Sequence, residues 1–282
     1  MEKELIIVNN TNSLVGEGPI WDVKTNTFLF LDIQGKCVFK HNEKTGETEK
    51  INLPQQIGCM AICENGDLLV ALEDAVYRLN KSGELVKAHQ DIKIKGRRFN
   101  DGKIGPDGAF YLGTTDENNE GAFYQLKDGV LTELFNGCGC SNGLDWTVDE
   151  KIMYYIDTPK QMIEAFDFDK EYGKILNRRK FVDIPIEIGK PDGMTLDAND
   201  DLWVALWDGH KIINIDKDTK EIKKEFCVPC PKVSCCSFGG AGLNEIYITT
   251  AGLYDTDEYE LAGKTFKMIS DVKGKAVYYY KY

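Results

Sequence analysis

Three oxygen-bearing side chains stand in similar contexts along the chain and could together bind a divalent cation. Glu17 lies in Val-Gly-Glu-Gly-Pro-Ile-Trp-Asp, Asn142 in Ser-Asn-Gly-Leu-Asp-Trp, and Asp192 in Lys-Pro-Asp-Gly-Met-Thr, each directly before a glycine. This set supplies hard oxygen donors and two negative charges, which suits Ca²⁺, Mg²⁺ or Mn²⁺; Zn²⁺ is possible, although it usually takes His or Cys ligands. A cation with open coordination positions can polarise a carbonyl or activate a water, so the set predicts hydrolytic chemistry.

Each of these segments, taken alone, is an ordinary turn sequence. Gly-Glu-Gly-Pro, Ser-Asn-Gly and Pro-Asp-Gly all contain residues that favour tight turns. The interpretation as a metal site depends on where the segments lie, because they stand at matching points of a weak internal repeat. Side chains at equivalent points of repeated units converge when those units are arranged around an axis.

The repeat has six units. Their starts are spaced 40 to 50 positions apart and align on Gly18, Gly58, Gly102, Gly143, Gly193 and Cys235. Each start precedes a short strand-like piece, a polar turn and an apolar run rich in aromatic and branched residues, as strands are. Further strand-like runs follow in most units, and in the last unit we expect one over residues 276–280. Convincing helix signals are nearly absent.

Six units of about four strands at this period predict an all-β fold, a six-bladed β-propeller with four-stranded blades. We expect residues 1–282 to form this propeller as a single domain. The alternative is a β-sandwich in which the similarity between segments is accidental. In a propeller the innermost strands start near a central channel, which would place Glu17, Asn142 and Asp192 around a common axis.

A second group of polar residues opens the third unit, in Arg-Arg-Phe-Asn-Asp-Gly-Lys (97–103). Arg98 and Asn100 offer donors that could hold the hydroxyls or the carboxylate of a polar ligand. Asp101 could accept hydrogen bonds or take part in proton transfer. The alternative is a basic turn at the surface. The acidic loop 116–120 ends the same unit's next strand and could form part of the channel mouth.

The charge and hydropathy of the chain limit its partners. Lys and Arg total 34 against 46 Asp and Glu, which gives a formal net charge of −12. An acidic protein of this kind argues against nucleic acid and against an anionic membrane surface as partners. The first ten residues do not resemble a signal peptide, and no apolar run is long enough to span a bilayer. We therefore expect a cytoplasmic protein.

Other chemistries find little support in the sequence. The nine cysteines would be thiols that pack as small apolar residues in a reducing cytoplasm. Cys227 and Cys230 form a Cys-x-x-Cys, but a zinc knuckle or redox pair lacks a second ligand pair at suitable spacing. No Gly-x-Ser-x-Gly nucleophile elbow is present. The three histidines, of which His210 lies in a turn after a strand, are interpreted as structural.

With these segments in view, the chain resembles the gluconolactonase / regucalcin (senescence marker protein) / luciferin-regenerating enzyme family. The resemblance runs from about residue 14 to the C-terminus and is specific in its combination of motifs. The matching segments are Gly-Glu-Gly-Pro-Ile-Trp-Asp (16–22), Arg-Phe-Asn-Asp-Gly-Lys (98–103), Ser-Asn-Gly-Leu-Asp-Trp (141–146), Tyr-Tyr-Ile-Asp (154–157), Pro-Asp-Gly-Met-Thr-Leu-Asp (191–197), Leu-Trp-Val-Ala (202–205), Ser-Phe-Gly-Gly (237–240) and Tyr-Ile-Thr-Thr-Ala (247–251).

The resemblance implies a six-bladed propeller with one central divalent metal and hydrolysis of sugar lactones. It also implies roles: Glu17, Asn142 and Asp192 as metal ligands, Asp192 as the catalytic acid/base, and Arg98 and Asn100 as substrate-binding residues. In that mechanism the cation assists attack of water on the lactone carbonyl, and Asp192 moves the proton. The expected partner is a small sugar lactone, and the expected state is a monomer or weak oligomer.

Two further functions stay open on the sequence. One is a propeller that binds a metal or senses a ligand without catalysis, because propellers host many functions. The other is a related hydrolase of apolar lactones or phosphotriesters. Arg98 and Asn100 at the channel mouth favour a polar substrate, whereas an aromatic-lined mouth would favour an apolar one.

Overall fold

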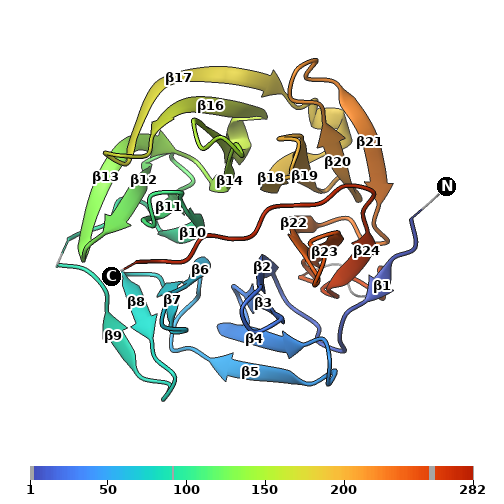
Figure 1. Ribbon diagram of the computed structural model, residues 1–282, viewed down its shortest axis with the longest axis horizontal. Helices are drawn as coiled ribbons and strands as arrows, with labels where there is room; N and C mark the ends of the chain where they lie inside the picture. Colours follow the sequence, from blue (N-terminus) through green and yellow to red (C-terminus); the bar gives the residue numbers. More distant parts are fainter. Residues whose placement is uncertain (1–2, 91, 254–257, 282) are drawn as a thin grey trace.

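Six antiparallel sheets of four strands each are arranged around one axis in the computed structural model, which describes residues 3–90, 92–253 and 258–281 (Figure 1). The six-bladed β-propeller predicted from the repeat is therefore confirmed. The described residues contain no α-helix, only the short 3₁₀ turns η1 (Thr158–Lys160) and η2 (Ile186–Ile188). None of their helices could cross a membrane.

The two inner strands of each blade lie nearest the axis. The innermost strands are β2 (Gly16–Asp22), β6 (Cys59–Ile62), β10 (Arg98–Ile104), β14 (Ser141–Trp146), β18 (Lys190–Leu196) and β22 (Val233–Gly239). The second strands are β3 (Thr27–Asp32), β7 (Leu68–Ala71), β11 (Phe110–Thr115), β15 (Ile152–Asp157), β19 (Leu202–Trp207) and β23 (Glu245–Thr250). Each innermost strand contacts the innermost strands of both neighbouring blades, which closes the ring.

The outermost strand of each blade is the most exposed of its four strands, whereas the third strand is mostly buried. The third strands are β4 (Cys37–Asn42), β8 (Val76–Leu79), β12 (Gly121–Lys127), β16 (Met162–Asp169), β20 (Lys211–Ile215) and β24 (Phe266–Ile269). The outermost strands are β5 (Thr48–Asn52), β9 (Leu85–Lys87), β13 (Val130–Cys138), β17 (Lys174–Asp183), β21 (Ile222–Cys227) and β1 (Ile6–Ile7). The last blade is thus completed by the N-terminal strand, whose Ile6 pairs with Lys267 of β24.

The expected strand over residues 276–280 is absent from the last blade. Its place beside β23 is taken by β24, and β1 covers the outer edge of β24, so the sheet has no edge left for it. The segment instead crosses the propeller axis from the last blade to the second (Figure 1). It is held at its ends by isolated bridges, Asp197 with Gly274 and Cys63 with Tyr280.

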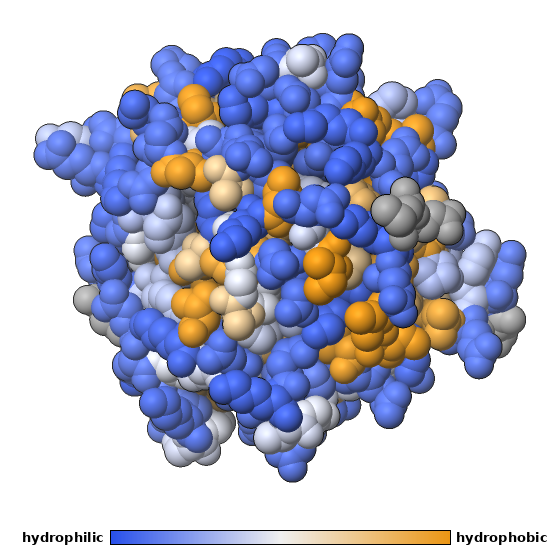
Figure 2. Space-filling model, turned by 45° about the vertical axis from the view of Figure 1, so that its right-hand side comes forward, coloured by the Kyte–Doolittle hydropathy of each residue, from blue (hydrophilic) through white to orange (hydrophobic). Residues whose placement is uncertain are grey.

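The hydrophobic core is divided into six clusters, one at each interface between neighbouring blades. A sheet is stabilised by burying its apolar face, so each blade depends on both of its neighbours. At the closure between the last and first blades the rings of Phe28 and Tyr247 stack with centroids 4.3 Å apart. On the face shown in Figure 2 the surface is mostly hydrophilic, with separate small apolar patches.

Candidate metal centre on the propeller axis

The predicted ligands lie at irregularities of the innermost strands. The pairing of β2 with β3 shifts register between Glu17 and Ile20, and β14 and β18 shift in the same way between Ser141 and Leu144 and between Pro191 and Met194. A β-bulge bends its strand and re-aims a side chain, and such bulges recur beside functional sites. Asn142 and Asp192 lie within such an irregularity, and Glu17 lies at the start of one.

The glycines after Asn142 and Asp192 permit close approach of neighbouring blades. A Cβ on Gly143 would lie 2.5 Å from the backbone N of Met194, and one on Gly193 would lie 2.2 Å from Sγ of Cys235. No side chain fits at these distances, so glycine is required where neighbouring innermost strands converge. The Asn-Gly and Asp-Gly pairs that suggested turns serve here to bring the ligand-bearing strands together.

An acidic centre forms where these strands meet. Glu17 and Asp192 are 7% and 6% exposed, and their charges repel each other and that of Asp101. Burial, followed by the charge of Asp101, raises the pKa of Glu17 to about 8. Burial and then the charge of Glu17 raise the pKa of Asp192 well above its usual range, and burial raises that of Asp101 to about 6. Buried carboxylates of this kind call for a compensating cation.

The two predicted carboxylate ligands have oxygen capacity to spare. Glu17 accepts a hydrogen bond from its neighbour's backbone, Gly18 N to Oε2 at 2.9 Å. The carboxylate of Asp192 accepts no hydrogen bond from any described residue. An ionised carboxylate offers about four lone pairs, and a buried one without donors is expensive unless it binds a metal or a proton.

The amide of Asn142 is held on both sides. Its Nδ2 donates to Oγ1 of Thr158 at 2.7 Å, and its Oδ1 accepts from Nδ2 of Asn100 at 3.0 Å. A carbonyl oxygen has two lone pairs, so Oδ1 retains one that could reach a cation.

Asn100 hydrogen-bonds Asn142 and Arg98 hydrogen-bonds Asn100, and these two residues, predicted to bind substrate, differ in what they can offer a ligand. Nη1 of Arg98 donates to Phe99 O at 2.7 Å and to Oδ1 of Asn100 at 2.8 Å. The other guanidinium nitrogens of Arg98 could therefore donate to a ligand. Both amide hydrogens of Asn100 are used, by Ser141 O and by Oδ1 of Asn142. Asn100 can therefore offer a ligand only its remaining acceptor capacity.

The donor set fits a hard divalent cation. Two carboxylates and an amide oxygen, all buried on the axis, match the oxygen ligands that Ca²⁺, Mg²⁺ and Mn²⁺ prefer. Within residues 3–90, 92–253 and 258–281, no group of three or more His, Cys, Asp or Glu side chains is arranged to hold a metal. The zinc-knuckle alternative around Cys227 and Cys230 thus finds no support. The set of Glu17, Asn142 and Asp192 falls outside this criterion, because only two of its members are His, Cys, Asp or Glu.

Several residues near the centre were not predicted from the sequence to belong to it. Asp101 was noted, but not as a member of the acidic centre, although it precedes Gly102 just as the three ligands precede their glycines. Cys140 was interpreted as packing, yet its Sγ lies 3.5 Å from Nδ2 of Asn100. Thr158 carried no signal, because it lies in no repeat position. The acidic loop is exposed, and its Glu117 lies 3.9 Å from Arg97.

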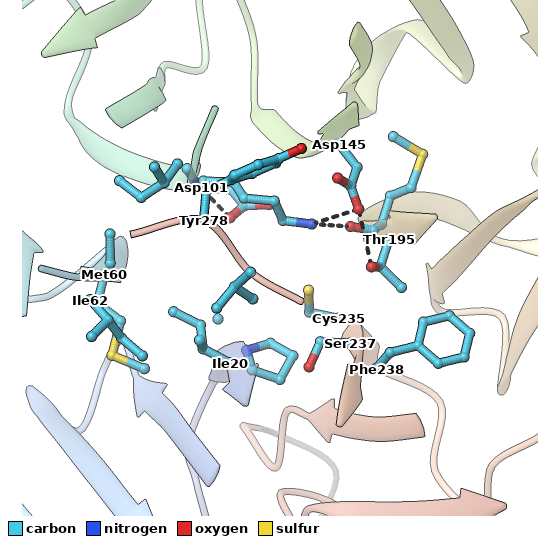
Figure 3. Close-up of a pocket in the computed structure, with 18 of the residues that line it drawn as sticks. Ile20, Met60, Ile62, Asp101, Asp145, Thr195, Cys235, Ser237, Phe238 and Tyr278 are labelled. Atoms are coloured by element: carbon cyan, nitrogen blue, oxygen red, sulfur yellow. Dashed lines mark hydrogen bonds and ion pairs between the residues drawn. The ribbon is translucent and has the colours of Figure 1, made fainter. Parts of the chain in front are cut away.

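A cavity of about 70 Å³ lies further along the same strands, lined by residues that follow the ligand positions (Figure 3). The crossing C-terminal segment contributes Tyr278 to its wall, and Asp101 lies between it and the acidic centre. The Oγ of Ser237, buried in this wall, has no hydrogen-bond partner among the described residues. The space is polar enough and large enough to hold ordered water.

Comparison with known proteins agrees with this geometry. A protein-family model, described as the SMP-30/Gluconolactonase/LRE-like region, matches residues 15–252. The chain belongs to this family. Regucalcin of Homo sapiens is 34% identical over 288 residues, covering 95% of each chain. A luciferin-regenerating enzyme superposes with a TM-score of 0.90 at 28% identity, covering 99% of this chain and 100% of that one.

A second solved structure shares the fold. It is a calcium-binding protein, regucalcin, from Agrobacterium tumefaciens, with a TM-score of 0.94, 23% identity and coverage of 100% of this chain and 99% of that one. The family includes gluconolactonases by name, so this chain is a lactonase-like propeller. The resemblance stated from the sequence motifs is therefore confirmed.

Proposed function

We propose that this protein is a divalent-metal-dependent hydrolase that opens sugar lactones. The observation that supports the proposal is the pair of buried carboxylates Glu17 and Asp192, whose charges repel each other, with the buried Asn142 on the strand next to that of Asp192. Membership of a family that includes gluconolactonases supports the reaction class.

In the proposed site Glu17, Asn142 and Asp192 hold the metal. When bound, a divalent cation supplies Lewis-acid stabilisation of a developing oxyanion and a water of lowered pKa. The hard oxygen ligands favour Ca²⁺, Mg²⁺ or Mn²⁺ over Zn²⁺. The description of the Agrobacterium protein as calcium-binding supports Ca²⁺ among these.

The remaining residues would bind and orient the substrate. Arg98 presents guanidinium donors that suit the hydroxyls of a sugar lactone and the carboxylate of its hydrolysis product. Asn100 keeps Arg98 in place through the 2.8 Å hydrogen bond to its Oδ1 and offers acceptor capacity to a substrate hydroxyl. A polar rim of this kind favours a hydroxylated lactone over an apolar one.

Asp192 is the proposed acid/base. Its carboxylate accepts no hydrogen bond from the described residues, so its oxygens are open to the substrate side of the site. Burial and the charge of Glu17 raise its pKa, which favours accepting a proton. A bound cation opposes this shift, so the working pKa of Asp192 is set by the balance of the two effects.

Hydrolysis of D-glucono- and D-xylonolactone by chelator-stripped protein tests the proposal, followed as acid release. Ca²⁺, Mg²⁺, Mn²⁺ and Zn²⁺ are added back separately, and Asp192→Ala serves as the control. Activity restored by a metal and abolished by the substitution is the expected result. Tight metal binding without turnover would instead favour the metal-binding or sensing function, to which the calcium-binding description of the Agrobacterium protein points.

A further inference from the structure

A continuous chain of hydrogen bonds runs from the substrate side of the site to the backbone beside Asp192. Nη1 of Arg98 donates to Oδ1 of Asn100, and Nδ2 of Asn100 donates to Oδ1 of Asn142. Nδ2 of Asn142 donates to Oγ1 of Thr158, and that hydroxyl donates to the carbonyl oxygen of Pro191 at 2.8 Å. The chain links the innermost strands of three blades through Thr158.

The two ends of this chain fix its direction. A guanidinium can only donate and a carbonyl oxygen can only accept, so every group between Arg98 and Pro191 has one consistent orientation. The hydroxyl of Thr158 donates its hydrogen to Pro191 O, so its oxygen can only accept the hydrogen bond from Nδ2 of Asn142. The amide of Asn142 is thereby oriented at both of its polar atoms, and Oδ1 faces away from Thr158.

The orientation of this amide decides whether Asn142 can bind a cation. The oxygen and nitrogen of an amide are nearly the same size, so packing alone does not distinguish them. Beside the buried carboxylates Glu17 and Asp192, an unrestrained amide would turn its NH₂ toward the negative charges. That orientation presents no lone pair to a cation.

Thr158 is itself held firmly. It begins η1 directly after β15, with Pro159 as the next residue, and its backbone N donates to Cys140 O at 3.0 Å. The carboxylate of the preceding Asp157 accepts hydrogen bonds from the backbone N of Gly139 and of Cys140. Cys140 lies two residues before Asn142, so these hydrogen bonds fix Thr158 beside the strand that carries Asn142.

We propose that Thr158 is a positioning residue: its hydroxyl orients the amide of Asn142 so that Oδ1 is available to a divalent cation on the axis. The inference rests on the metal centre proposed above. Groups that orient a metal ligand from outside the coordination sphere typically change metal affinity 10- to 100-fold when removed.

The test compares Thr158→Val, which removes the hydroxyl at nearly constant volume, with Thr158→Ser, which keeps it. Chelator-stripped full-length proteins are titrated with Ca²⁺ and with Mn²⁺ by isothermal titration calorimetry, and folding is checked by circular dichroism and Tm. We expect Thr158→Val to raise the Kd about 10-fold or more and Thr158→Ser to stay within about 3-fold of wild type. Thr158→Ala is a second hydroxyl-free variant in case Val does not fold.

The outcomes separate this inference from the proposed function. Glu17→Gln is titrated in parallel, and undiminished binding in that variant would overturn the metal centre and this inference with it. If Glu17→Gln loses binding while Thr158→Val and Thr158→Ala bind as wild type, only the role of Thr158 is wrong. Equal weakening by Ser and Val would also overturn it, because the hydroxyl would then not be the cause.

Discussion

Lys103 of β10 and Asp145 of β14 form an ion pair inside the propeller, with Nζ 3.3 Å from Oδ2. Asp145 is buried and also pairs with Lys275 of the crossing C-terminal segment, whose Nζ lies 3.1 Å from Oδ1. Backbone N atoms of Trp146 and Leu196 donate to the same carboxylate. The carboxylate of Asp145 thus ties β14 to β10, to β18 and to the residues that lead into the crossing C-terminal segment.

Replacing this carboxylate is expected to destabilise the fold. Asp145→Asn leaves two lysines without their partner, and breaking a buried pair lowers the free energy of unfolding by about 3 kcal/mol. Denaturant unfolding at pH 7 measures the change. Asp149→Asn, an exposed acid on the same hairpin, is the control and should change stability by less than about 0.5 kcal/mol.

The same pair predicts a pH dependence. Lys103 and Lys275 outweigh the effect of burial and hold the pKa of Asp145 below its usual range. A lowered carboxyl pKa stabilises the folded state above the unfolded-state value of about 3.9, and that stabilisation is lost as pH falls below it. The stability difference between wild type and Asp145→Asn should therefore be constant near neutrality and shrink below about pH 4. A stability difference at pH 3 that is no smaller than the difference at pH 7 would contradict the assignment.

Removing one acid from the axis should separate stability from metal binding. At pH 8 without metal, Glu17→Gln relieves repulsion among buried carboxylates, so we expect its free energy of unfolding to rise by roughly 1–3 kcal/mol. The increase in Tm that a bound metal gives the wild type should be lost. Scanning calorimetry with chelator and with Ca²⁺ measures both. The exposed Glu117→Gln should match wild type in each condition, and a Glu17→Gln protein less stable than wild type in chelator would refute the repulsion.

The close approach of β14 and β18 is open to a steric test. Gly143→Ala would place its Cβ 2.7 Å from Asp192 O as well as against Met194, so we expect a loss of about 2–3 kcal/mol and weaker metal binding. Gly83→Ala, which has open space but a φ of +85°, should lose about 1–2 kcal/mol and keep its metal affinity. Unfolding curves and calorimetric Kd values distinguish the two variants.

The thiol beside the substrate residues should react slowly. Burial and the charge of Asp192 raise the pKa of Cys140 to about 12, so little thiolate is present at pH 8. Cys227 is exposed. Timed iodoacetamide labelling with peptide mass spectrometry should show Cys227 modified at least about 100-fold faster than Cys140. Comparable rates at the two thiols would contradict the raised pKa of Cys140.

The sequence by itself determined the architecture and predicted which residues form the site. A repeat of 40 to 50 residues with strand-like runs predicted six four-stranded blades, because every unit must bury its faces against two neighbours. The position of Glu17, Asn142 and Asp192 before equivalent glycines predicted that they converge. A sequence repeat indicates which residues occupy matching positions, because each unit repeats the same strand pattern.

Only the tertiary structure decided what lies between the repeats. Thr158 belongs to a 3₁₀ turn rather than a repeat position, and its hydroxyl joins Asn142 of its own blade to Pro191 of the next, a contact that depends on how the two blades pack. The sequence pattern predicts a strand over residues 276–280. In the structure β24 and β1, from the other end of the chain, form the outer strands of the last blade, and residues 276–280 cross the axis. Contacts between residues far apart in the chain follow from the closing of the ring, and local sequence patterns do not encode them.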